Sequence, residues 1–255
     1  MYKRQPHHNH SDLVIKALNK GKAVYVEKPL ALDIQSITDI EESIYRSENP
    51  KLFIGFNRRF SKSTQFVKQK LINSPANSIN LRFSVPPLNS DHWTNIKEIG
   101  GGRIVGEAVH GIDLACYLFD SLPQSISASA PVDKSNNVVK DNQVFLNINF
   151  ANGSHASLQY FSEANQILSK ERVEVHGEGN SYILEDFKML RFLEGSQDRS
   201  KTFSTGKGHK ESLSIFFDYV RDKSQNPFTW EEIKAVSKAA IIAQDHINSG
   251  QQHNV

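Results

Sequence analysis

Residues 21–30 of the chain read GKAVYVEKPL, in which a short apolar segment, AVYV, is followed by a charged pair and a proline. The segment predicts a buried strand that ends before Pro29, because proline cannot donate to a strand ladder. A helix that Ser11 can cap is expected before this strand, and a helix with isoleucines on one face is expected after it. The next apolar strand is KLFIGF at residues 51–56. Helices that alternate with almost wholly apolar strands indicate a parallel α/β sheet.

Lys28 would stand at the carboxyl end of the first strand, the edge at which open α/β sheets present ligand-binding groups. An ammonium there can donate a hydrogen bond to a substrate hydroxyl and stabilise the oxyanion that forms as its proton leaves. Taken alone, the tripeptide Glu-Lys-Pro is more simply interpreted as a surface ion pair at a strand end.

The pattern changes after Arg59. Several segments between residues 81 and 175 alternate apolar and polar residues, which predicts strands with one buried face and one face that is solvated or covered by a partner. Asn152-Gly153 is a hairpin signal, and two amphipathic helices end the chain. We therefore predict α/β plus α+β architecture: part of a Rossmann-type parallel sheet at residues 1–59, then an α+β domain at residues 60–255. The second domain would hold a large, mainly antiparallel open sheet with flanking helices.

Composition excludes several classes. The 255 residues carry a formal charge of +2 with no long basic run, which gives no case for nucleic acid or an anionic membrane as partner. No stretch has the length of about 18 apolar residues that a membrane span requires, and no secretory segment follows Met1. Cys116 is the single cysteine, so an internal disulfide is impossible. A cytoplasmic enzyme with a small-molecule substrate is expected.

The start of the chain predicts an incomplete domain. Two parallel strands need neighbours on their edges, whereas residues 1–5, MYKRQ, are polar. The sequence contains no Gly-x-Gly-x-x-Gly, and the glycines at 100–102 have the wrong spacing for a phosphate-binding turn. We expect a truncated Rossmann domain, weak or absent cofactor binding and no turnover by these 255 residues alone. Measurable dehydrogenase activity would refute this expectation. The alternative is a complete short protein with an irregular start.

A second constellation lies in residues 100–113, GGGRIVGEAVHGID. If the segment is helical from about Val105, then Glu107, His110 and Asp113 fall at i, i+3 and i+6 along one stripe. His110 suits a general base, because the pKa of histidine lies near neutrality. The three side chains could instead ligate a divalent metal, although no fourth ligand stands at a recognisable spacing. A structural histidine is the third interpretation.

These motifs resemble the Gfo/Idh/MocA family of glucose–fructose oxidoreductases and inositol dehydrogenases. The resemblance rests on a histidine that opens a helix (His10), on GKAV at 21–24, on EKP at 27–29 and on GFNRRF at 55–60, and it covers nearly the whole chain. It implies an oxidoreductase that transfers hydride between NAD or NADP and a hydroxyl of a sugar, polyol or sugar derivative. Lys28 and His110 would be catalytic, and the Lys28–Pro29 peptide bond would be cis. The cofactor contacts would be His10, Glu27, Lys28 and Pro29.

One departure concerns Gly106, which stands where the family commonly has an aspartate. Glu107 is the adjacent acid, but in an α-helix it would point about 100° away. The triple glycine and this helix resemble a branch in which the oxidoreductase part can follow a zinc alcohol-dehydrogenase-like part, so an upstream fusion partner is possible.

Further substrate-binding candidates are Arg58, Arg59, Glu107, Asp113 and Trp93. Guanidinium groups suit anionic or polyhydroxyl ligands, and an aromatic face suits a sugar ring. His7 and His8 are expected in solvent, and the segment KGHK at 207–210 could line the cleft. The rivals to the dehydrogenase are a non-catalytic binding or oligomerisation module and a metal-dependent enzyme that uses Glu107, His110 and Asp113. The open sheet favours a homo-oligomer.

Overall fold

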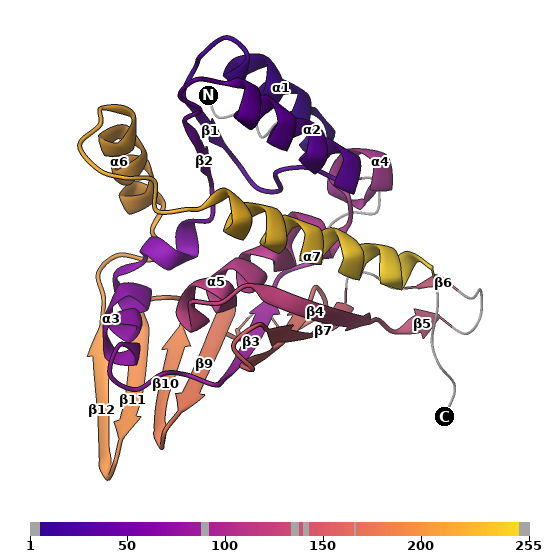
Figure 1. The fold of residues 1–255 in the computed structure, drawn as a ribbon. Coiled ribbons are helices and arrows are strands. Elements are labelled where there is room, and N and C mark those ends of the chain that lie inside the picture. The colour runs from indigo at the N-terminus through magenta and orange to yellow at the C-terminus, as the bar shows by residue number, and fades with distance from the viewer. Residues whose placement is uncertain (1–5, 88–91, 134–137, 140–142, 166, 250–255) are drawn as a thin grey trace.

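The computed structural model describes residues 6–87, 92–133, 138–139, 143–165 and 167–249. The polar start at residues 1–5, on which the expected truncation partly rests, lies outside the described residues. Helices and two short parallel strands form the first unit (Figure 1). Its elements are the 3-10 turn η1 (His7–Asn9), α1 (His10–Leu18), β1 (Val24–Val26), α2 (Ile34–Arg46) and β2 (Leu52–Ile54).

Strands β1 and β2 pair in parallel, with Val24 opposite Leu52 and Val26 opposite Ile54. All three residues of β2 are buried, as their uninterrupted apolar run predicts. Helix α1 begins at His10, one residue before the cap that we expected at Ser11. The Rossmann-type element order is therefore present, and the chain leaves this unit through the 3-10 turn η2 (Asn57–Phe60) and α3 (Lys62–Leu71).

The second sheet has eight strands in the order β12-β11-β10-β9-β3-β8-β7-β4. Strands β3 and β8 pair in parallel and the other neighbours are antiparallel, in agreement with the predicted mainly antiparallel sheet. The hairpin at Asn152-Gly153 joins β7 to β8. The bounds are β3 (Ser78–Ser84), β4 (Pro123–Ser129), β7 (Gln143–Phe150), β8 (His155–Phe161), β9 (Glu171–Gly177), β10 (Asn180–Glu185), β11 (Met189–Glu194) and β12 (Gln197–Thr202).

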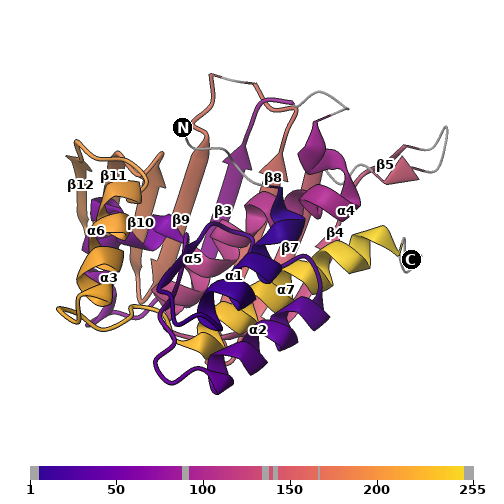
Figure 2. The ribbon, with the colours of Figure 1, turned by 90° about the horizontal axis from the view of Figure 1, so that it is seen from above.

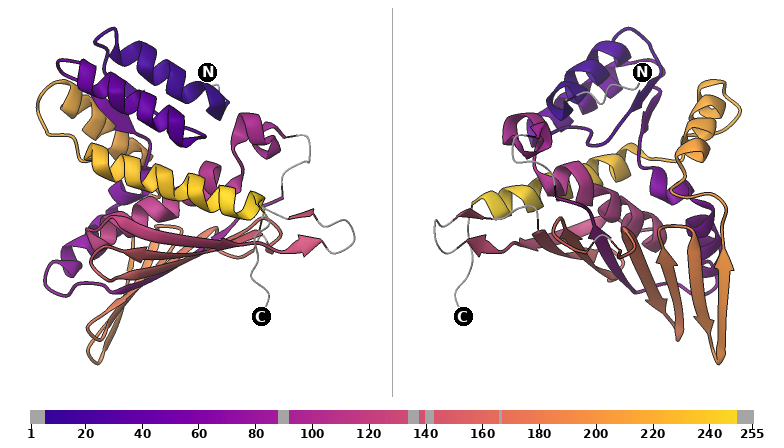
Figure 3. Two further views of the ribbon diagram at one scale, coloured as in Figure 1. Left: turned by 45° about the vertical axis from the view of Figure 1, so that its right-hand side comes forward. Right: turned by 180° about the vertical axis from the view of Figure 1, so that it is seen from behind.

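Helices cover one face of this sheet and leave the other open (Figure 3). Along β7 the buried residues Val144, Leu146, Ile148 and Phe150 alternate with more exposed ones. The alternation of apolar and polar residues in the sequence therefore predicts which face of the strand the helices cover. The covering helices are α3, α5 (Val109–Phe119) and α7 (Trp230–Asn248), and Figure 2 shows them from above the sheet with α6 (His209–Val220) at one side. The predicted homo-oligomer through the open face stays a prediction.

Helix α5 lies so close to the sheet that glycine is needed at its centre. A Cβ on Gly111 would stand 2.1 Å from Leu158 Cδ1 and 3.2 Å from Phe83 Cζ. The absence of a side chain therefore lets α5 approach β8 and β3, which carry those two residues. This close packing fixes the backbone next to Gly111, and with it the neighbouring His110.

Strands β10, β11 and β12 were not predicted from the sequence. All residues of β12 are exposed and polar, so no apolar alternation marks it. The remaining elements are η3 (Trp93–Asn95), α4 (Lys97–Gly100), η4 (Ile104–Ala108) and the two-stranded sheet of β5 (Val132–Asp133) and β6 (Val138–Val139). None of the described helices combines the length and the apolar character that a membrane crossing would need.

Candidate active site

Lys28 emerges at the carboxyl end of β1 and points to the turn before α5. Its peptide bond to Pro29 is cis, as the resemblance implied. The Lys28 ammonium donates to Glu107 Oε1 at 3.0 Å and to the carbonyl oxygen of Gly106. Burial lowers the pKa of Lys28, and the Glu107 carboxylate opposes this effect. Lys28 is thus a desolvated cation that two oxygen atoms hold in one position.

Glu107 contacts Lys28 from a π-helical turn. The Val109 N–H bonds to the Ile104 carbonyl five residues earlier, so η4 is wider than an α-helix. Our expectation of an α-helix from about Val105 is therefore wrong for the turn that carries Glu107. Burial would raise the pKa of Glu107, but the charge and hydrogen bond of Lys28, together with the charges of Arg58 and Lys170, outweigh burial and lower it.

His110 follows on α5 and is 3% exposed. Its Nδ1 atom has no hydrogen-bond partner among the described residues. Burial lowers the pKa of His110 well below 6.5, and the charges of Arg58 and Lys28 act in the same direction. The ring is therefore neutral at pH 7 and holds an unpaired buried nitrogen, so it can accept a proton when a ligand is bound.

Arg58 enters this region from η2 and is bound by Glu171 at the start of β9. Arg58 Nη2 donates to Glu171 Oε1 at 2.9 Å, and Nε donates to Oε2 at 3.1 Å. Lys207 donates to the same Oε1. Sequence reasoning missed Glu171, although its signal was present: Glu171, Val173 and Val175 share the buried face of one strand. A carboxylate in such a row requires buried cations.

The loop that carries Lys207 is fixed by its approach to η2. Gly208 adopts φ +80°, and a Cβ there would stand 2.5 Å from the Asn57 carbonyl oxygen. Asn57 Nδ2 donates to the Lys207 carbonyl at 2.6 Å, and the His209 ring lies 3.3 Å from the same nitrogen. Lys207 and His209 of the segment at 207–210 therefore border the site.

Arg59 and Asp113 are placed apart from the expected substrate contacts. They form an ion pair in which each side chain is 1% exposed. The Arg59 guanidinium also stacks on Phe228 at 4.4 Å and on Tyr117 at 5.0 Å. Because the two charges bind one another inside the protein, we assign them a structural role and do not include them in the site.

The helix that His10 opens borders the same region. His10 Nδ1 lies 2.7 Å from the Pro29 carbonyl oxygen, while Glu27 is exposed at the strand end. His7 was expected in solvent, and this is wrong: it is 8% exposed and its Nδ1 lies 2.7 Å from the Gly100 carbonyl oxygen. Burial lowers the pKa of His7 to about 4.

Trp93 contacts the site through His7. The two rings meet edge to face at 4.8 Å. The His7 ring in turn occupies the space beside Gly106, where an added Cβ would stand 3.3 Å from its Cε1 atom. His7 thus fills the position that a side chain at residue 106 would take.

The metal-dependent alternative finds no support in the geometry. Across the described ranges, no three histidine, cysteine, aspartate or glutamate side chains are grouped so as to hold a metal ion. Of the three ligands considered, Glu107 is bound by Lys28 and Asp113 by Arg59.

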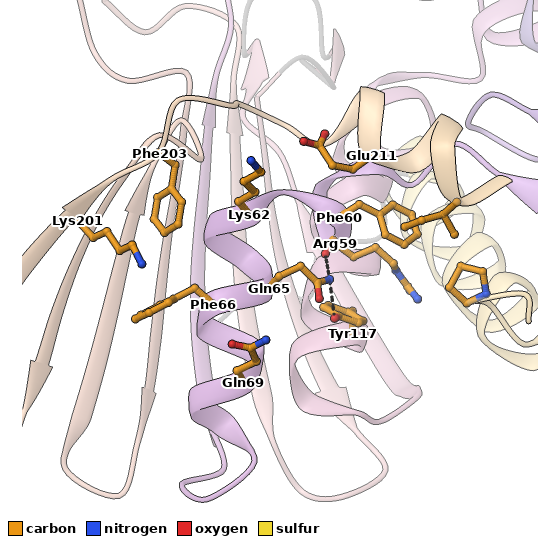
Figure 4. A pocket seen from close by; sticks show the side chains of 12 residues that line it. Arg59, Phe60, Lys62, Gln65, Phe66, Gln69, Tyr117, Lys201, Phe203 and Glu211 are labelled. Carbon is orange, nitrogen blue, oxygen red and sulfur yellow. Dashed lines mark hydrogen bonds between the residues drawn. The ribbon is translucent and has the colours of Figure 1, made fainter. Parts of the chain in front are cut away.

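A separate groove of about 620 Å³ lies between α3, β12 and α6 (Figure 4). Gln65 stands at its centre and donates to the Arg59 carbonyl and to the Tyr117 hydroxyl, as the dashed lines show. Neither Lys28 nor His110 lines it, so we place the candidate active site at the carboxyl ends of β1 and β2 instead. The groove is also lined by Lys62, Phe66, Gln69, Lys201, Phe203 and Glu211.

Comparison with known proteins decides the family. A model described as the oxidoreductase family with NAD-binding Rossmann fold matches residues 4–56, and one for the GFO/IDH/MocA C-terminal domain matches residues 76–183. The chain belongs to the Gfo/Idh/MocA family of oxidoreductases. Both halves of the predicted architecture thus correspond to domains of this family, whereas the exact boundary at residues 59 and 60 stays a prediction.

Comparison with individual proteins agrees with the match to the two family models. Inositol 2-dehydrogenase of Rhizobium meliloti is 26% identical over 78% of this chain and 67% of its own length. Myo-inositol 2-dehydrogenase of Thermotoga maritima is 22% identical over 95% of this chain and 69% of its own length. The structure of aldose-aldose oxidoreductase from Caulobacter crescentus matches with a TM-score of 0.82 at 15% identity, over 97% of this chain and 76% of that one. The chain spans about two thirds of the length of the two inositol dehydrogenases.

Proposed function

We propose that the protein transfers hydride between a nicotinamide cofactor, NAD or NADP, and a hydroxyl-bearing carbon of a sugar, polyol or sugar derivative. The observation that supports this most directly is the neutral, buried His110 with an unpaired Nδ1 atom, whose pKa is depressed in part by the nearby Lys28 ammonium. A neutral base beside a fixed cation is the pair that alcohol oxidation requires.

The carboxyl edge of β1 suits the cofactor, because parallel sheets bind nucleotides at this edge. His10, Glu27, Lys28 and Pro29 lie there and would border the nicotinamide ring. The unpaired polar atom of His110 and the Lys28 ammonium are the groups that a ligand hydroxyl would bind. When it is bound, the nicotinamide supplies the acceptor of the hydride.

The residues of this chain handle the proton and the oxygen. The substrate hydroxyl would donate its proton to the His110 imidazole while its oxygen accepts a hydrogen bond from Lys28. The ammonium stabilises the negative charge that develops on that oxygen. Glu107 holds Lys28 in position, and the cations around His110 favour release of the proton afterwards.

Replacing His110 by glutamine tests the assignment. The variant keeps a side chain that can form hydrogen bonds but cannot accept the proton, so we expect kcat to fall by about 10²–10⁴. Polyol binding, measured by ligand-observed NMR, should stay within a few-fold of wild type. The chain is assayed with NAD and NADP and a panel of polyols, and turnover by wild type would also refute the expected inactivity of these 255 residues. The His110 imidazole resonances are followed on titration with the polyols, which requires no turnover. Equal measurable turnover by wild type and variant, or polyol binding that leaves these resonances unmoved, would overturn the proposal.

The pH profile gives an independent test of the same base. Because the pKa of His110 lies well below 6.5, kcat/KM should stay constant as the pH falls from 8 to 6.5 and should decline only in more acidic solution. A histidine in water would already lose activity near pH 6.5. An acid limb at or above 6.5 would contradict a buried His110 as the proton acceptor.

A further inference from the structure

The candidate site contains one more buried cation than its carboxylates can neutralise. Glu171, which is 2% exposed, is shared by two cations, Arg58 and Lys207. The Arg58 side chain is 9% exposed and is bound in a bidentate manner, whereas Lys207 shares a single oxygen and remains 22% exposed. Lys207 is thus desolvated, only partly compensated, and still open to a ligand.

The other charges of the site do not remove this excess. Lys28 and Glu107 neutralise one another as an ion pair. At the solvent edge the exposed Lys170 and Glu27 carry opposite charges. Asp186 is held by the backbone N–H of Glu171 at 2.9 Å. Three cations of the site, Lys28, Arg58 and Lys207, therefore face two carboxylates, Glu107 and Glu171.

A partly buried cation without its own counter-ion is costly, and an anionic ligand offsets that cost. A lysine ammonium is a compact donor that suits carboxylate and phosphate oxygens. Position matters as well, because Lys207 is held by the Asn57 bond to its carbonyl and by the close approach at Gly208. The cation is built into the site and does not lie on a free surface loop.

His110 supplies the second observation. Its unpaired Nδ1 is fully buried, and both Arg58 and Lys207 act on its charge. Gly111, the next residue on α5, packs against Phe83, whose register partner on β9 is Glu171. A ligand whose hydroxyl reaches the imidazole therefore lies near the Arg58–Glu171–Lys207 cluster. We propose that the substrate is an anionic polyol, a sugar bearing a carboxylate or phosphate group, whose anion binds Lys207 while a hydroxyl reaches His110. This inference rests on the proposed function and specifies its substrate class.

Binding of three probes tests the inference: neutral myo-inositol, glucuronate and glucose 6-phosphate. Dissociation constants are measured by titration calorimetry on the full chain. At least one anionic sugar should bind tenfold or more tightly than myo-inositol, and the better of the two identifies carboxylate or phosphate as the anion. Lys207→Met should remove this preference, and Lys207→Arg should retain it. Lys210→Met, a matched loss of charge at an exposed residue of the same segment, should leave it unchanged.

The outcomes separate the two proposals. Equal affinity for the neutral and both anionic probes, or a preference that survives in Lys207→Met, would overturn the anionic substrate and leave the dehydrogenase assignment standing. Binding of none of the probes would overturn both. The wild-type comparison does not depend on a variant, so it decides the question even if Lys207→Met fails to fold.

Discussion

Replacing Asp113 by asparagine should destabilise the folded protein by about 3 kcal/mol, because it leaves a buried guanidinium without its carboxylate. Arg59 and Asp113 are each 1% exposed, so water cannot replace the lost partner. Burial opposes the Arg59 charge, and the Asp113 carboxylate raises the pKa of Arg59 against it. A guanidinium does not lose its proton in proteins, so Arg59 stays charged in the variant. Glu232, 3.6 Å away, compensates for part of the loss. The midpoint of urea unfolding measures the effect.

The control is an ion pair of the same type on the surface. Arg191 and Asp198 form a bidentate pair on β11 and β12, and both side chains are about half exposed. Asp198→Asn should leave the urea midpoint nearly unchanged, because water and salt screen exposed pairs. Equal shifts in the two variants would show that the Arg59–Asp113 pair is not desolvated as the structure has it.

This pair also explains why sequence reasoning placed Asp113 at the substrate. The spacing of His110 and Asp113 predicted that both lie along one stripe of a helix, and Asp113 was a candidate for binding the substrate. In the structure Asp113, about one helical turn after His110, forms a buried ion pair with Arg59 of η2. Spacing on a helix gives the direction of a side chain but not what lies opposite, and the partner comes from a turn 54 residues earlier.

The parallel strands, the hairpin and the alternating strands were predictable because each depends on residues close in the chain. The π turn was not, because it needs a single extra residue between Ile104 and Val109 that no periodicity marks. The burial of His7 was missed for a similar reason. Its hydrogen bond to Gly100 joins residues 93 positions apart, and the surrounding residues, PHHNH at 6–10, give no local sign of it.

The buried charges show the same limit more sharply. Arg58 was a candidate site residue on the basis of its motif. The sequence around it does not predict an ion pair with Glu171, because Glu171 lies 113 residues away. Burial of an acid on the inner face of β9 is understandable only when the cations from η2 and from the loop before α6 are both in place. The site is assembled from three segments that lie far apart in the sequence. Sequence motifs can therefore identify individual site residues such as Arg58, but not the residues with which they form ion pairs.

Replacing Glu171 by glutamine should make the stability of the protein less sensitive to acid. Burial alone would raise the pKa of Glu171, but Arg58 and Lys207 outweigh it and lower the pKa from 4.5 to about 2. A carboxyl whose pKa is lower in the folded state binds protons more readily when unfolded. Its contribution, about 3 kcal/mol from this shift, is therefore fully present above pH 4.5 and is lost as the pH falls toward 2.

The stability of wild type, measured by urea unfolding at successive pH values, should consequently fall steeply between pH 4.5 and 2. The Glu171→Gln curve should start lower at neutral pH, because Arg58 and Lys207 lose their counter-ion, and should be flatter below pH 4.5 so that the two curves converge in acid. Glu178→Gln makes the same chemical change at an exposed turn and should follow wild type at every pH. If the Glu171 variant instead runs parallel to wild type through this range, the carboxylate is not the shared counter-ion of two cations. The excess positive charge that argues for an anionic substrate would then have to be reassigned.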